Sequence, residues 1–298
     1  MPAAVLEIDR ITKRYGHVVA CEDVSLTVAP GELFGLVGGD GAGRTTTLRV
    51  ALGVLPPDSG EVRLGGEPVT LAVRRRIGYL PEERGLYPRM RLLDQLVYLA
   101  ELHGMDTGDA HRAADHWTAR LGLRDRRGDA ARRLSLGDQQ RARLAAALVH
   151  GPDVLVLDEP FAGLDPVAVD AVGEVLRERA AAGAPVLFSA RSLELAERWC
   201  DRIGVIHNGR MVVQGTVAEL GAAGSGEVVV DAPAAPAGWA DGLTGVRILG
   251  VHNGRTRLLL GEDADDQAVL AAALATGPVR EFTRQRPTLA ELYRDVVP

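Results

Sequence analysis

The chain has 298 residues, of which 46% are hydrophobic and 25% are charged, a balance typical of a globular protein with a substantial core. Its net charge of -6 argues against nucleic acid as a partner. Two widely separated cysteines exclude a disulfide framework and suit a reducing cytosol, and the sequence shows neither a secretion signal nor a run of about 18 apolar residues that would cross a membrane.

The first part of the chain combines strand-like alternation with one short helical segment. Apolar and polar residues alternate around a turn at Gly16, which predicts two or three strands. A short apolar strand then runs into a glycine-rich loop, and the helix after the loop ends before two prolines. The expected elements are strands within residues 4–28, a strand at 31–38, a helix at 45–55 and a hairpin at 60–69.

The middle of the chain changes from helical spacing to alternating strands and helices. Apolar residues recur about every third or fourth position, which predicts an all-helical insert at roughly residues 87–150. The alternation that follows predicts an α/β fold with a mostly parallel sheet and antiparallel N-terminal strands. The expected elements are strands at 153–160, 184–190 and 202–209, and helices at 169–183 and 193–200.

The composition changes near residue 224, where small residues and prolines predict a linker and a loop. We therefore expect a large domain at residues 1–224 and a small α+β domain at residues 225–298. The second domain is predicted to hold strands at 227–232, 245–251, 256–261 and 279–282, and helices at 265–277 and 288–297.

The glycine-rich loop, GGDGAGRTTT at residues 38–47, nearly matches the phosphate-binding pattern G-x-x-x-x-G-K-[ST]. Gly38 and Gly43 have the required spacing and Thr45 is placed to bind Mg²⁺, but Arg44 stands where the pattern has lysine. Backbone amides and the positive end of the following helix dipole would hold phosphate there. An ordinary glycine-rich turn is the alternative for this loop alone.

Two further segments carry groups suited to nucleotide chemistry. The apolar strand VLVLDEP ends in Asp158, which would hold Mg²⁺ through water, and Glu159, which would polarise the attacking water. The segment LSLGDQQR opens a helix with Ser135 and Gly137, an arrangement that suits an anion. Taken singly, the first segment fits a strand with a capped turn and the second a plain helix cap.

The order of these segments resembles the ATP-binding subunits of ABC transporters over residues 4–220. A phosphate-binding loop, an L-S-x-G-x-Q-Q signature and D-E-P follow one another, and FAGLDP with Asp165 comes next. The segment RIGYLPEERGLYPRM resembles the branch that serves ABC-2 type exporters, where Glu82 often replaces a glutamine. The phrase RPTLAELY near the C-terminus resembles the end of that branch's small accessory domain.

The resemblance implies a P-loop ATPase fold that binds ATP and Mg²⁺ on the cytoplasmic face of the membrane, as a peripheral subunit. It implies two partners, a second nucleotide-binding subunit and an integral membrane permease, with Leu86 and Met90 as candidates to face the permease or to be buried within the insert. Each ATP would lie between one chain's loop and the other chain's signature.

The implied nucleotide-binding residues are Tyr15, which would stack on adenine, Gly38, Gly39, Asp40, Gly41, Ala42, Gly43, Arg44, Thr45, Thr46, Ser135, Gly137, Asp138 and Asp165. The implied catalytic residues are Glu159, Arg191 and Glu82, and the implied metal-binding residues are Thr45, Asp158 and Glu82.

The sequence departs from the family pattern at the expected phosphate site. Arg44 replaces the loop lysine, Arg191 replaces a switch histidine, and Asp40 replaces the usual asparagine. Leu136 and Asp138 vary the signature in a way that is common in this branch. A guanidinium is larger and more planar than an ammonium, so we expect nucleotide binding to survive in weakened form and hydrolysis to decrease more.

The sequence leaves three possible functions open. The chain is either an ATPase that drives an exporter, or a poorly hydrolysing regulatory or scaffold half of an asymmetric pair. A third possibility is an ATP switch without a permease, against which the EERGLYP segment argues. Lys13 is the single lysine of the chain, so a general drift toward arginine is an alternative origin for Arg44.

Overall fold

The computed structural model describes residues 5–82, 85–222, 226–236, 238–261 and 264–285. The chain divides into two compact units, Met1–Thr216 and Val217–Pro298. This division falls slightly before the change in composition near residue 224. The predicted helix at 288–297 and the RPTLAELY phrase lie outside the described residues. No helix among the described residues is both long and apolar enough to span a membrane.

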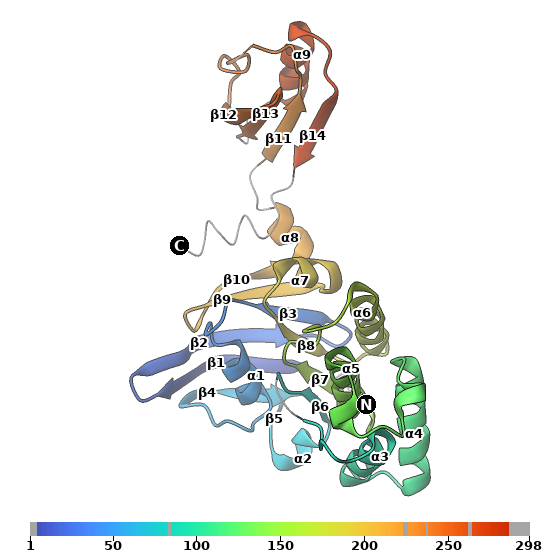
Figure 1. The fold of residues 1–298 in the computed structure, drawn as a ribbon. Helices are drawn as coiled ribbons and strands as arrows, with labels where there is room; N and C mark the ends of the chain where they lie inside the picture. Colours follow the sequence, from blue (N-terminus) through green and yellow to red (C-terminus); the bar gives the residue numbers. More distant parts are fainter. Residues whose placement is uncertain (1–4, 83–84, 223–225, 237, 262–263, 286–298) are drawn as a thin grey trace. The chain divides into compact units, whose positions relative to one another are not determined.

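The first unit begins with an antiparallel sheet of strand order β2-β1-β4-β5 (Figure 1). The alternating pattern near the N-terminus forms two strands, which pair from Leu6 opposite Val28 to Tyr15 opposite Val18. The predicted hairpin is the pair β4 and β5, and β4 also pairs with β1. The strands are β1 (Leu6–Tyr15), β2 (Val18–Val28), β4 (Ser59–Leu64) and β5 (Glu67–Pro68).

The second sheet of this unit has the strand order β10-β9-β3-β8-β7-β6 and is parallel except for its edge strand β10. The central strands are apolar along nearly their whole length and fully buried, as expected for a parallel sheet covered on both faces. The strands are β3 (Leu33–Val37), β6 (Ile77–Leu80), β7 (Val154–Leu157), β8 (Val186–Ala190), β9 (Arg202–His207) and β10 (Arg210–Thr216).

Helix α1 (Arg44–Ala51) contacts strands of both sheets (Figure 1). Its buried residues Leu48 and Val50 belong to one core cluster with apolar side chains of both sheets. The loop that leads into α1 passes so close to other backbone that two of its positions leave no room for a side chain and require glycine. A Cβ at Gly43, whose φ is 105°, would lie 2.3 Å from the Ala20 carbonyl oxygen, and one at Gly38 would lie 2.4 Å from the Ile206 carbonyl oxygen.

The helices of the insert follow the predicted spacing. Asp106 caps the N-terminus of the second helix, α4, by accepting a hydrogen bond from the Asp109 amide. This cap fixes the residue at which α4 begins. The insert comprises α3 (Leu92–Leu102), α4 (Thr107–Arg120), two short 3₁₀ helices at Arg124–Arg126 and Ala131–Arg133, and α5 (Leu136–Leu148). The remaining helices of the first unit are α2 (Leu71–Arg74), α6 (Pro166–Ala181) and α7 (Leu193–Trp199).

The second unit is a small α+β domain with its own core. Its antiparallel sheet has the order β12-β13-β11-β14, and alternate residues such as Val228, Val230 and Leu258 are buried together with Val269 of the helix. Its elements are α8 (Val217–Ala222), β11 (Gly226–Asp231), β12 (Val246–His252), β13 (Arg255–Leu260), α9 (Asp266–Thr276) and β14 (Glu281–Gln285).

Candidate functional site

The parallel sheet brings the predicted site residues together because several of its strands end at the same edge. The glycine-rich loop follows β3, Glu82 follows β6, Asp158 and Glu159 follow β7, and Arg191 follows β8. These strands are parallel neighbours in the sheet, so their carboxyl ends meet at one edge. In open α/β sheets this edge is where ligands bind.

A hollow of about 340 Å³ lies along the loop. Thr45 and Thr46 line it at the N-terminus of α1, where the backbone amides and the helix dipole favour an anion. Tyr15, which is about half exposed, lies at the same hollow. Its lining comprises Tyr15, Val18, Val19, Ala20, Gly39, Asp40, Gly41, Ala42, Gly43, Arg44, Thr45, Thr46 and Glu82. Most of the predicted nucleotide-binding residues are therefore gathered around one cavity.

Arg44 is buried, with its side chain only 8% exposed. It is the first residue of α1, where a positive charge is unfavourable to the helix dipole and needs a compensating partner. Its Nη1 donates to Oε1 of Glu159, and its Nη2 lies 3.7 Å from Oδ1 of Asp40. The residue that replaces the pattern's lysine therefore pairs with the carboxylate predicted to be catalytic.

Arg191 is more exposed and contacts three carboxylates. Its Nε lies 3.2 Å from Oδ1 of Asp40 and 3.4 Å from Oε1 of Glu159, and its Nη2 donates to Oε1 of Glu82 over 2.8 Å. These carboxylates raise the pKa of Arg191 above its usual value. Arg191 therefore keeps its charge at the edge where the loop and three strand ends meet.

The backbone of Glu159 is held in an uncommon conformation from two sides. Its φ is 52°, in the left-handed region that costs a non-glycine residue free energy and is often found at functional sites. Its amide donates to Oγ of Ser189 over 2.9 Å, and its carbonyl oxygen accepts from Nε2 of Gln140 over 2.9 Å. Ser189 in turn donates to Oδ1 of Asp158 over 2.6 Å. One serine thus orients both predicted acidic residues.

The two acidic side chains differ in their surroundings. Burial raises the pKa of Glu159, while the neighbouring Arg44 and Arg191 act in the opposite direction. Asp158 is almost fully buried, and its Oδ2 has no hydrogen-bond partner among the described residues. A buried, unsatisfied carboxylate oxygen fits a magnesium ion or one of its waters. Within the described ranges no three His, Cys, Asp or Glu side chains gather to hold a metal unaided, and Mg²⁺ commonly takes its other ligands from water and substrate phosphates.

The signature residues do not line the hollow. Ser135 caps α5 by accepting from the Asp138 amide over 3.1 Å, and Asp138 pairs with Arg141. Asp165 caps α6 by accepting from the Ala168 amide over 2.8 Å. A Cβ at Gly137 would lie 3.6 Å from the Gly163 carbonyl oxygen, so the signature and the segment before α6 are neighbours. These residues form a second cluster on the same unit, outside the loop's cavity.

Sequence reasoning missed two residues that shape the site, Ser189 and Gln140. Ser189 is the hydroxyl within the otherwise apolar strand β8, and it is fully buried. Gln140 is buried on α5, and its side chain also donates to the Pro160 carbonyl oxygen over 3.0 Å. A polar residue in a position that the pattern assigns to the core was the signal that could have identified both.

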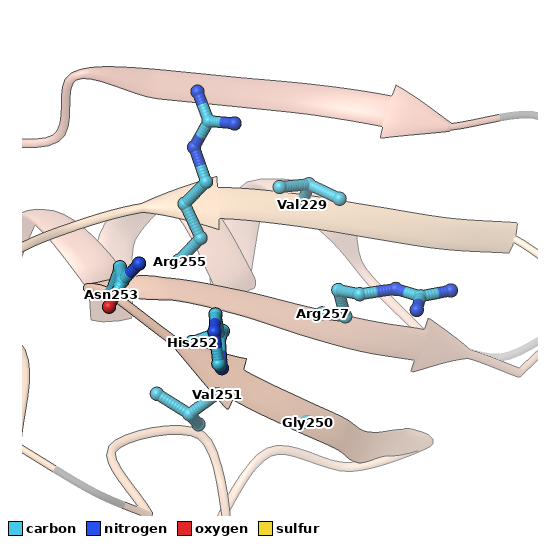
Figure 2. A pocket seen from close by; sticks show the side chains of 7 residues that line it. All are labelled: Val229, Gly250, Val251, His252, Asn253, Arg255 and Arg257. Carbon is cyan, nitrogen blue, oxygen red and sulfur yellow. The ribbon is translucent and has the colours of Figure 1, made fainter.

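A further hollow, of about 820 Å³, lies on the sheet of the second unit (Figure 2). Arg255 and Arg257 of β13 border it beside Val229 of β11. Arg255 pairs with Asp231 and Glu281, and Arg257 pairs with Glu227. Because both guanidinium groups are already held in ion pairs, we assign no anion site to this hollow.

Comparison with known sequences identifies two family profiles. The one described as ABC transporter matches residues 21–162, and the one described as ATP-binding protein DrrA1-3-like, C-terminal domain, matches residues 215–297. The chain is 34% identical over 303 residues to the uncharacterized ABC transporter ATP-binding protein YhaQ of Bacillus subtilis, which covers 98% of both chains. It is 38% identical over 223 residues to the Nod factor export ATP-binding protein I of Paraburkholderia xenovorans, covering 74% of this chain and 73% of that one. It is also 32% identical over 229 residues to the linearmycin resistance ATP-binding protein LnrL of Bacillus subtilis, covering 76% and 74%.

Solved structures agree with the fold. An ATP-binding subunit of an ABC transporter superimposes with a TM-score of 0.68 at 31% identity, over 72% of this chain and 91% of that one. A dimeric bacterial ABC transporter cassette superimposes with a TM-score of 0.67 at 21% identity, over 71% and 98%, and shows the fold alone. The predicted fold class is thus confirmed. The chain belongs to the family of ABC transporter ATP-binding subunits, and its second unit and its named relatives fit the ABC-2 exporter branch of that family.

Proposed function

We propose that this chain energises an ABC-2 type exporter by binding and hydrolysing ATP as one of two paired nucleotide-binding subunits. The observation that carries this proposal is the convergence of the phosphate loop, Asp158 and Glu159 at one sheet edge, where Ser189 holds the carboxylate of Asp158 and the backbone amide of Glu159. The relatives named for Nod factor export and linearmycin resistance support an export role.

In this proposal the loop of residues 38–46 binds the phosphates through its amides, and Tyr15 stacks on the adenine. Thr45 and Asp158 would hold Mg²⁺, with Glu82 nearby, and a bound ion would supply charge that neutralises the phosphates. Glu159 orients and polarises the attacking water, and the exposed guanidinium of Arg191 faces the terminal phosphate. Ser135, Gly137, Asp138 and Asp165 serve the site of the second subunit, which is consistent with their position outside the loop's cavity.

The same geometry favours a second candidate function, a poorly hydrolysing half of an asymmetric pair. Arg44 forms its ion pair with Glu159 itself, and both side chains are largely buried. Burial raises the pKa of Glu159, but Arg44 opposes this rise and occupies a carboxylate oxygen, so Glu159 is a weaker base for water than it would be without Arg44. Hydrolysis then requires that the nucleotide draw Arg44 away from Glu159.

The proposed permease contact is the segment that leads into α3. Leu86 and Met90 are only partly exposed, whereas Tyr87 is 52% exposed and packs edge-on against Tyr98, which is 41% exposed. Exposed tyrosine pairs are suited to protein interfaces, because their rings bury large area at low entropic cost. We propose this pair as part of the surface that meets a permease on the cytoplasmic face of the membrane.

Steady-state MgATP hydrolysis by the purified chain, beside the Arg44→Lys/Arg191→His variant, separates the two candidates. A motor subunit hydrolyses ATP at a rate within about tenfold of the double variant, whereas a regulatory half is inactive until both arginines are replaced. Glu159→Gln is the matched control and should be inactive in either background. If the wild-type chain and the double variant both bind MgATP yet fail to hydrolyse it, the proposed motor function is wrong.

A further inference from the structure

Four charged side chains around the phosphate loop form a closed ring of alternating sign. Arg44 contacts Glu159 and Asp40, and Arg191 contacts the same two carboxylates at 3.4 and 3.2 Å. Every link joins a guanidinium to a carboxylate, and Glu82 adds a further acidic partner for Arg191. The ring therefore couples the loop, through Asp40, to the ends of β7 and β8.

The inner and outer halves of the ring differ in burial. Arg44 and Glu159 are 8% and 12% exposed, whereas Arg191 and Asp40 are 57% and 79% exposed. The inner pair is fixed by its surroundings. The outer pair lies in solvent, and Asp40 lines the hollow in which the phosphates are expected. Asp40 and Arg44 both line this hollow, whereas Arg191 lies on the exposed side of the ring.

Asp40 presents an electrostatic difficulty for this site. A carboxylate beside an anion-binding loop repels phosphate, and its effect is strongest where water is partly excluded. Arg191 supplies the compensating charge, with its Nε on Oδ1 of Asp40. The long arginine side chain is 57% exposed, so the Asp40 carboxylate, together with Glu82 and Glu159, restrains where its guanidinium lies.

We propose that Asp40 and Arg191 act as one positioning pair in nucleotide binding. Arg191 cancels the repulsion of Asp40 for phosphate, and Asp40 holds the Arg191 guanidinium over the loop, where it contacts phosphate. Asp40 is thus a positioning residue that acts through Arg191. The inference rests on ATP binding at this loop, and it depends neither on hydrolysis nor on export.

A double-mutant cycle tests the pair by calorimetric titration of Mg-AMP-PNP into wild type, Asp40→Asn, Arg191→Gln and the double variant. In the Arg191→Gln background, Asp40→Asn removes the repulsion and, of the ion pairs, only the 3.7 Å contact with the buried Arg44, so it should strengthen binding about three- to tenfold. In the wild-type background the same substitution also removes one of the three carboxylates that restrain Arg191, so the change in affinity should stay within about twofold. If the two charges act independently, Asp40→Asn changes Mg-AMP-PNP affinity by the same factor in both backgrounds, and that result would overturn the inference.

A matched ion pair elsewhere provides the control. Arg76 and Asp153, which are 40% and 46% exposed, are bridged at 2.6 Å, and Arg76→Gln with Asp153→Asn should leave Mg-AMP-PNP affinity unchanged. Thermal unfolding without nucleotide should differ little among the Asp40 and Arg191 variants, since exposed pairs contribute little to stability. If the wild-type chain binds no Mg-AMP-PNP at all, the proposed function fails with the inference. If the wild-type chain binds Mg-AMP-PNP but Asp40→Asn changes its affinity by the same factor in both backgrounds, only the positioning pair is overturned.

Discussion

Ser189 illustrates how one buried hydroxyl can organise an active site. It donates to Asp158 and accepts from the amide of Glu159, whose backbone is in the left-handed region. Without it, two strongly polar groups lose partners inside the protein, and the left-handed backbone loses a restraint. Both losses act on the residues that the proposed function places at magnesium and at water.

We expect Ser189→Ala to lower the free energy of unfolding by about 1–3 kcal/mol, the usual cost of leaving buried polar groups without partners. It should lower the rate of ATP hydrolysis about 10- to 100-fold while changing MgATP affinity far less, because the loop is untouched. Urea denaturation and steady-state kinetics measure the two effects. Ser25→Ala is the matched control, since Ser25 accepts one backbone hydrogen bond at a partly exposed strand position. Wild-type hydrolysis by Ser189→Ala would contradict this role.

At the residue scale the sequence predicted the acidic residues and the loop, because their spacing is local and fixed by a strand and a turn. It did not predict that Arg44 would turn toward Glu159, which lies far along the chain. That contact depends on β3 and β7 lying in one sheet with β8 between them, a long-range arrangement that spacing alone does not specify. Ser189 was missed for the same reason.

At the scale of elements, two histidines join the ends of α3 and α5. The rings of His103 and His150 stack with centroids 3.8 Å apart, and His103 contacts the Leu99 carbonyl oxygen. Burial, followed by the charge of His103, lowers the pKa of His150 to about 4. Arg179 also lowers this pKa, while Asp153 acts in the opposite direction. The pair therefore packs best when His150 is neutral.

This pKa predicts a loss of stability in acid. Well above pH 6.5 His150 is neutral in both the folded and the unfolded chain and contributes nothing to the pH dependence of stability. As the pH falls from 6.5 toward 4, the unfolded chain takes up a proton that the folded chain does not, so the free energy of unfolding decreases, by about 2 kcal/mol at pH 5. Urea denaturation of wild type and His150→Phe at pH 7.5 and 5 should show a smaller pH effect in the variant. The exposed His111→Gln should behave as wild type, and an unchanged slope in His150→Phe would refute the assignment.

The elements themselves were mostly predictable, because the parallel strands are continuous apolar runs and helices such as α4, α5 and α6 carry side-chain caps. The short strand β6 was not separated from the motif around it, since only four residues lie between charged Arg76 and Pro81. The predicted N-terminal alternation left two or three strands open, and the structure resolves it as two. The number of strands depends on how β1 and β2 pair with each other, which the local sequence pattern does not specify.

At the scale of the whole molecule, the site contains two clusters that do not meet within one chain. The loop's cavity carries the phosphate groups, whereas Ser135, Gly137 and Asp165 lie at the starts of α5 and α6. The exposed apolar side chains Leu136 and Val167 lie beside them. A helix start that exposes apolar side chains is suited to contact with a second subunit, as the proposed pairing requires.

Gly137→Asp tests that pairing. The substitution places a carboxylate in the first turn of α5, where the helix dipole favours it, so the fold should be retained. Mg-AMP-PNP affinity of the single chain should stay within about twofold, because Gly137 does not line the hollow, but hydrolysis and nucleotide-dependent dimerisation should fall at least tenfold. Sedimentation velocity with and without nucleotide measures assembly. Gly137→Ala, whose added methyl meets nothing closer than 3.6 Å, is the control. A dimer that forms normally in Gly137→Asp would exclude the signature from the interface.

The buried guanidinium of Arg44 also changes how this protein can be detected. Nucleotide probes that acylate a lysine amine at the phosphate loop find no amine there, and the single lysine of the chain, Lys13, is 13% exposed and held by Asp58 at 2.9 Å. A guanidinium stays protonated and does not take up the acyl group. Chemoproteomic surveys that count ATP-binding proteins by lysine labelling will therefore overlook this chain even when its site is filled with nucleotide.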